Sequence, residues 1–193
     1  MTMTTISADA VKQLRELTGA GFMDCKRALE EADGDVDRAV LLLRERGLAA
    51  AARKAGREAR EGLVGSYIHT GGRVGVLIEV NCETDFVART DEFQKLVRDL
   101  AIQVAGLSPR WVSLDDVPAE AIEVKRLEFA GDPGTRGDVE SHVKRWLKEA
   151  VLLEQPFRDS SLTVGELVTD RVATIGENIR VRRFVRYALG EDA

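Results

Sequence analysis

The sequence predicts an α+β protein, in which a small helical unit precedes a larger domain whose helices pack on one side of an antiparallel sheet. Three observations indicate this fold class. Apolar residues recur every three or four positions through residues 7–47. Two β-rich runs flank Gly71-Gly72, which suits a hairpin loop because both glycines adopt positive φ readily. A third β-rich run, residues 179–187, would give the sheet a third strand.

The first unit, residues 1–47, is expected to contain three short helices. Ser7 suits the N-cap of the first helix, and the glycines within residues 18–21 allow a tight turn into the second. Asp35 suits the N-cap of the third helix, and Gly47 is expected to end it. Three helices of this length form a small bundle with a thin core.

Residues 48–61 change in composition, because alanine and charged residues replace the large apolar ones. We therefore expect a linker there, partly helical by propensity. The remaining residues, 62–193, are expected to form the α+β domain. Within it, residues 74–80 have the apolar run of a buried strand, and residues 93–104 have the spacing of an amphipathic helix whose N-cap is Thr90.

Composition and charge exclude several classes of protein. The chain has 193 residues, of which 44% are hydrophobic and 32% charged, as is typical of a soluble globular protein. A net charge of −5 gives no overall attraction to nucleic acid or to an anionic membrane surface. No apolar run reaches the roughly 20 residues that cross a bilayer, and residues 1–5 lack a signal-peptide pattern. We therefore expect a cytoplasmic protein.

No pattern in the sequence indicates covalent chemistry. Two cysteines, Cys25 and Cys82, make neither a disulfide framework nor a metal site. Cys82 with His69 as its base could be a nucleophile, but a free cysteine at the end of an apolar strand usually acts as a small hydrophobic residue. Phosphate-binding glycine loops and metal-ligand spacings are absent from the sequence. We expect neither enzymatic activity nor a metal or cofactor.

The most informative segment, residues 81–89, lies between the predicted buried strand and the amphipathic helix. It places Asp85 beside Phe86. In one interpretation Asp85 caps a short turn and Phe86 packs in the core. In the other, Phe86 is an exposed anchor for another protein. The second is favoured, because the helix already has its cap at Thr90 and its apolar face begins at Phe93.

Two other groups also have two interpretations. Phe22 and Met23, at the start of the second helix, are either core residues or a docking patch. The last strand contains four arginines that either contact RNA phosphates or protect an edge strand from aggregation. The acidic composition of the chain favours edge protection. These arginines are Arg180, Arg182, Arg183 and Arg186.

Two segments carry a resemblance to a known family. TGAGFMDCKRAL at residues 18–29 closely resembles the N-terminal signature of bacterial elongation factor Ts, and VNCETDFVA at residues 80–88 resembles its second signature. QPF at residues 155–157 and IGENI at residues 175–179 resemble further segments. The resemblance covers residues 6–190 and implies a three-helix domain of the ubiquitin-associated type, followed by an α/β core with a three-stranded antiparallel sheet.

The resemblance also implies a function, guanine-nucleotide exchange on elongation factor Tu during translation. In that family the threonine-aspartate-phenylalanine-valine turn inserts into the GTPase domain of the partner and disturbs its Mg²⁺ site, so that GDP leaves. The matching residues here are Thr84, Asp85, Phe86 and Val87 for the turn, and Phe22, Met23 and Lys26 for a docking patch on the small domain.

The chain departs from longer family members because it contains one copy of the core instead of two related halves. His69 resembles the corresponding turn of the second half, while Asp85 and Phe86 match the first. The resemblance therefore implies that the protein acts as a homodimer, in which two copies supply both roles.

Overall fold

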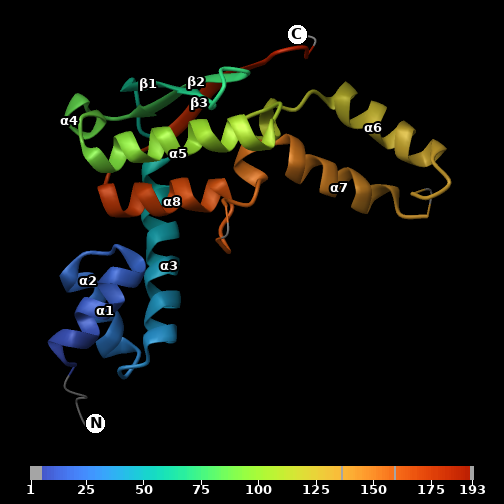
Figure 1. The fold of residues 1–193 in the computed structure, drawn as a ribbon. Coiled ribbons are helices and arrows are strands. Elements are labelled where there is room, and N and C mark those ends of the chain that lie inside the picture. The colour runs from blue at the N-terminus through green and yellow to red at the C-terminus, as the bar shows by residue number, and fades with distance from the viewer. Residues whose placement is uncertain (1–5, 136, 159, 192–193) are drawn as a thin grey trace. The chain divides into compact units, whose positions relative to one another are not determined.

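The computed structural model describes residues 6–135, 137–158 and 160–191. The first five residues, for which the sequence predicts no signal peptide, lie outside this part. The chain forms two compact units (Figure 1). The first comprises the described residues of Met1–Glu58 together with Thr169–Ile179, and the second comprises those of Ala59–Val168 and Arg180–Ala193. The combination of helices with a three-stranded antiparallel sheet confirms the predicted α+β class.

The first unit contains helices α1 (Ala8–Thr18), α2 (Phe22–Glu31) and α3 (Val36–Lys54). Both predicted N-caps are confirmed. Ser7 Oγ accepts a hydrogen bond from the Ala10 amide at 3.1 Å, and Asp35 Oδ1 accepts one from the Arg38 amide at 3.0 Å. The buried residues of the bundle are Val11, Leu14, Cys25, Ala28, Leu29, Ala32 and Ala39.

The prediction that Gly47 ends the third helix is wrong, because α3 continues through Gly47 to Lys54. A glycine inside a helix costs only about 1 kcal/mol relative to alanine, and the alanines that follow are strong helix formers. Helix α8 (Val164–Ile175) passes close to this glycine. A Cβ on Gly47 would lie 3.3 Å from Cβ of Ala173. The glycine therefore permits close helix packing instead of marking a stop.

The second unit is built on strands β1 (Glu61–Ile68), β2 (Val74–Cys82) and β3 (Arg180–Ala188), in the order β1-β2-β3. Both neighbouring pairs are antiparallel. Gly71 and Gly72 have φ of +89° and +68°, and the His69 amide donates to the Val74 carbonyl at 2.9 Å. The predicted hairpin with two positive-φ glycines is therefore confirmed, but its loop is longer than the expected two residues: residues 69–73 lie outside both strands, and the Gly72 amide closes the turn by donating to the His69 carbonyl at 2.9 Å.

Helix α5 (Asp91–Leu107) covers one face of this sheet (Figure 1). Alternate residues of β2, namely Val76, Ile78 and Val80, are buried, as the two-residue period of a strand requires. The facing side chains of α5 are also buried, and they include Phe93, Leu96, Val97, Leu100, Ala101 and Val104. This layer is the core that fixes the end of β2 and the start of α5.

Gly65 on β1 lets α5 lie directly against the sheet. A Cβ at this position would lie 2.4 Å from Cγ1 of the buried Val97. We expect Gly65→Ala to lower the free energy of unfolding by about 1–3 kcal/mol, because the branched side chain of Val97 is stiff and has to shift to relieve the overlap. Urea unfolding measures this loss. Val97→Ala should cost less in the Gly65→Ala background than alone, and strictly additive effects would contradict the clash.

The remaining elements extend the second unit away from α4 (Asp85–Ala88). Helices α6 (Ala119–Gly131) and α7 (Val139–Ala150) lie side by side (Figure 1) and are joined by an ion pair of 2.8 Å between Arg126 and Glu140. Single 3₁₀ turns occur at Leu114–Asp116 and Leu152–Glu154. Among the residues that the structure describes, no helix has the length and apolar character needed to span a membrane.

Candidate functional site

The turn between β2 and α5 folds into the single-turn helix α4. Thr84, and not Asp85, is its N-cap, since Thr84 Oγ1 accepts a hydrogen bond from the Val87 amide at 3.3 Å. The Asp85 carboxylate instead pairs with Arg89, with 2.7 Å between Oδ2 and Nη2. Because both of these side chains are exposed, this ion pair contributes little to stability.

Phe86 projects outward from this turn, and 77% of its surface is exposed. Its neighbours Val87 and Ala88 are 7% and 4% exposed, so the opposite side of α4 is packed against the unit. The interpretation in which Asp85 caps the turn and Phe86 packs in the core is therefore wrong on both points. An exposed phenylalanine on a turn anchored from behind is typical of a protein-binding anchor.

Thr90 joins α4 to α5. Its hydroxyl donates to the Val87 carbonyl at 2.8 Å and accepts from the Phe93 amide at 3.3 Å. The second bond is the N-cap that the sequence predicts. The first is a contact that capping rules do not predict, and it fixes the C-terminal end of the turn that carries Phe86.

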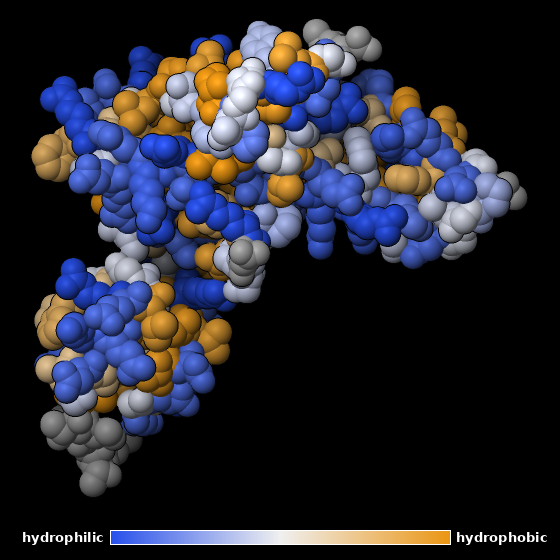
Figure 2. Space-filling model, in the orientation of Figure 1, coloured by the Kyte–Doolittle hydropathy of each residue, from blue (hydrophilic) through white to orange (hydrophobic). Residues whose placement is uncertain are grey.

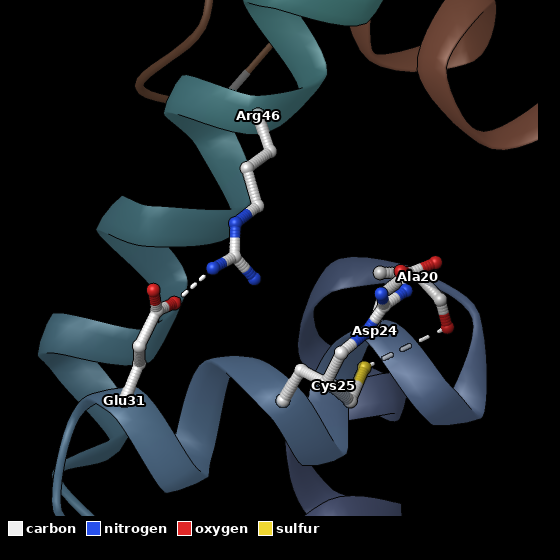
Figure 3. Close-up of polar contacts among 6 residues, drawn as sticks. Ala20, Asp24, Cys25, Glu31 and Arg46 are labelled. Carbon is white, nitrogen blue, oxygen red and sulfur yellow. Dashed lines mark hydrogen bonds and ion pairs between the residues drawn. The ribbon is translucent and has the colours of Figure 1, made fainter.

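The candidate docking patch lies at the start of α2. Phe22 and Met23 are 49% and 59% exposed, so the interpretation of these two as core residues is wrong. Lys26, one turn later, also lies at the surface and is 3.8 Å from the Glu30 carboxylate. The core side of α2 is instead formed by Cys25, whose Sγ donates to the Ala20 carbonyl at 3.7 Å (Figure 3).

An ion pair between Glu31 and Arg46 links the C-terminal end of α2 to α3 (Figure 3). Asp24 in the first turn of α2 pairs with Arg27 at 2.6 Å. The Asp24–Arg27 pair lies within α2, so it is the packed core together with the Glu31–Arg46 pair that holds α2 in place while its first two residues remain exposed.

The face of the sheet opposite α5 is the largest feature that the sequence analysis missed. We name this surface the open sheet face. It is formed by exposed apolar side chains from all three strands, and part of the apolar surface over the strands is visible in Figure 2. Its members are Val64, Ile68, Leu77, Val185 and Tyr187. Leu77 is at its centre, between Ser66 and Val185 in the strand register. An exposed apolar patch of this kind usually marks an interaction surface.

The arginines of β3 are held by a β-bulge. Glu79 pairs with Arg183 in the register and Val80 pairs with Val181, so Arg182 is the extra residue of the bulge. Both arginines therefore lie near one carboxylate. Arg183 Nε is 2.7 Å from Glu79 Oε2, and Arg182 Nε is 3.7 Å from Glu79 Oε1.

This arrangement lowers the pKa of Glu79. Loss of water around the carboxyl group would raise it, but hydrogen bonds from Arg183 and Asn81 and the charges of both arginines outweigh that effect. Arg186 is also engaged, because its Nη1 pairs with Glu191 at 2.5 Å. Since these three side chains have partners within the fold, the geometry favours the charged edge strand over RNA contact.

Cys82 and His69 lie at opposite ends of β2 and cannot act together. Cys82 is the last residue of this nine-residue strand, and His69 pairs with its first residue through the hairpin. A strand of that length spans roughly 30 Å. The Cys82 thiol is fully buried, whereas His69 is exposed and contacts Tyr67 Oη at 3.0 Å. Within the described residues, no cluster of His, Cys, Asp and Glu could hold a metal ion.

Comparison with known proteins places this geometry in a family context. A family model described as elongation factor TS matches residues 49–191. Elongation factor Ts from Carboxydothermus hydrogenoformans is 53% identical over 96% of this chain and 90% of its own length. The protein of the same name from Coprothermobacter proteolyticus is 53% identical over 96% of this chain and 99% of its own length. That from Synechococcus elongatus is 54% identical over 98% of this chain.

Proposed function

The chain belongs to the elongation factor Ts family, and on that premise we propose that it is a guanine-nucleotide exchange factor for elongation factor Tu. Family membership supports a role in translation elongation, which would place the protein in the cytoplasm. The observation that carries the proposal is Phe86, a large apolar side chain that is 77% exposed on a turn fixed at both ends.

The proposed mechanism uses α4 as a wedge. The buried Val87 attaches the turn to the unit and Thr84 caps it, so that Asp85 and Phe86 face the partner. When they enter the GTPase domain, they displace the Mg²⁺ ion, which is the largest positive charge opposite the diphosphate. GDP then binds more weakly and dissociates. No covalent bond changes in this process.

Exchange of this kind obeys thermodynamic linkage. The factor accelerates release only if it binds the nucleotide-free partner more tightly than the GDP-bound partner. Nucleotide therefore weakens the grip of the factor by the same ratio. The exposed Phe22, Met23 and Lys26 supply a second contact on the small unit, which contributes affinity without touching the nucleotide site.

We also propose that the protein acts as a homodimer whose two copies meet through the open sheet face. One chain holds Phe86 and His69 at opposite ends of β2, so one copy cannot bring both to the same place. The open sheet face has exposed apolar side chains on all three strands, and pairing with a second copy would remove them from water.

A nucleotide-release assay tests the proposed function. Elongation factor Tu loaded with fluorescent GDP is mixed with excess unlabelled GDP, and catalytic amounts of the protein are added. We expect the release rate to rise in proportion to the amount added, with each molecule acting many times. Release that is unchanged, or that requires stoichiometric amounts, would contradict an exchange factor.

A further inference from the structure

The buried thiol of Cys82 contacts the turn that carries Phe86. Cys82 is the last residue of β2 and is fully buried. Its Sγ donates to the Thr84 carbonyl at 3.1 Å. That same carbonyl accepts the Ala88 amide at 3.3 Å, which is the hydrogen bond that closes α4. The rigid strand and the short helix therefore share one acceptor.

A single helical turn needs such external support. Helix α4 has four residues, and a first turn gains little from its own hydrogen bonds relative to the backbone freedom that it loses. Thr84 determines the direction of this turn, because its hydroxyl caps α4 and its carbonyl begins the ladder. A contact that orients the Thr84 peptide thus orients the base from which Phe86 projects.

We propose that Cys82 is a positioning residue for α4: its thiol holds the Thr84 carbonyl so that Phe86 is presented in one orientation. Its effect on nucleotide exchange rests on the proposed function, whereas its effect on the turn does not. The thiol acts as a hydrogen-bond donor from inside the unit and takes part in no reaction.

Two substitutions separate this role from simple packing. Cys82→Ser keeps a donor but adds polarity to a buried site, while Cys82→Ala keeps an apolar side chain but removes the donor. If only packing matters, serine is the worse replacement, since a buried hydroxyl carries a desolvation cost. If the hydrogen bond from the thiol matters, Cys82→Ala disorders the turn more than Cys82→Ser does. The two explanations predict opposite orders.

Hydrogen–deuterium exchange of the Val87 and Ala88 amides measures the order of the turn directly. We expect Cys82→Ala to speed exchange of these amides about fivefold, the effect of losing one modest hydrogen bond, and Cys82→Ser to stay within about twofold of the unmodified chain. Cys25→Ala, which removes the other buried thiol, serves as the matched control and should leave both amides unchanged. In the release assay, kcat/KM should fall about fivefold for Cys82→Ala alone.

Three outcomes would overturn the proposal. The first is faster exchange of the Val87 and Ala88 amides in Cys82→Ser than in Cys82→Ala, and the second is unchanged exchange of these amides in Cys82→Ala. The third is an equal loss of amide protection throughout the β-sheet, which would indicate general destabilisation. The two proposals can fail separately. If the unmodified chain does not accelerate GDP release, the proposed function fails, while the amide measurement still decides the role of Cys82.

Discussion

Phe86→Ala is expected to lower kcat/KM for GDP release by about 30- to 1,000-fold, the range that corresponds to the loss of a binding hot spot. The side chain is 77% exposed, so it contributes little to the core of its own unit. Its loss should therefore act on the complex with elongation factor Tu, and mainly on the state in which Mg²⁺ is displaced.

The folded state provides the control for this substitution. Thermal unfolding of Phe86→Ala should occur within a few degrees of the unmodified chain, because truncating an exposed side chain costs at most about 0.5 kcal/mol. Leu127→Ala removes a similarly exposed apolar side chain, 70% exposed on α6, and should leave the release rate unchanged. A Phe86→Ala protein that releases GDP at the normal rate would refute the wedge.

Local rules account for the parts of the fold that could be predicted from the sequence. Ser7, Asp35 and Thr90 cap their helices because each side-chain oxygen accepts a hydrogen bond from the amide three residues later, which requires no tertiary information. The hairpin at Gly71 and Gly72 was predictable for the same reason, since positive φ at two successive positions is easy only for glycine, although the length of its loop was not.

Tertiary packing decides the features that the sequence could not supply. Gly47 is a residue type that commonly ends helices, but here it lies inside α3, where it lets α8 pack closely. Arg182 and Arg183 are adjacent in the sequence, so in a regular strand their side chains should face opposite sides of the sheet. The bulge instead brings both side chains to Glu79. Neither outcome can be derived from spacing alone.

In the candidate site, too, some features could be predicted from the sequence and others depend on tertiary packing. The exposure of Phe86 could be argued from the sequence, because Thr90 and Phe93 already meet the needs of α5. The bond from Cys82 to Thr84 could not, since a cysteine that ends an apolar strand has the same pattern whether or not its thiol meets a carbonyl. The open sheet face also escaped prediction, because Leu77 belongs to a continuous apolar run that indicates burial on both sides.

Leu77→Asp is expected to convert the proposed dimer into monomers. Leu77 lies at the centre of the open sheet face, opposite Val185 in the strand register, and is 49% exposed in the single chain. In a dimer joined through this face, aspartate would bring an unpaired charge into an apolar interface, which costs several kcal/mol per copy. Each 1.4 kcal/mol changes the dissociation constant tenfold, so the dissociation constant of the dimer should rise by more than about 100-fold.

Sedimentation equilibrium over micromolar concentrations measures this change, and the release assay gives its consequence. The monomer should lose exchange activity if the proposed dimer is needed to supply both Phe86 and His69, which lie at opposite ends of β2 in one copy. Leu127→Asp adds the same charge to an exposed leucine of α6 and should leave both the dimer and the activity intact. A Leu77→Asp protein that remains dimeric would show that the dimer interface lies elsewhere. A fully active monomer would show that exchange needs only one copy.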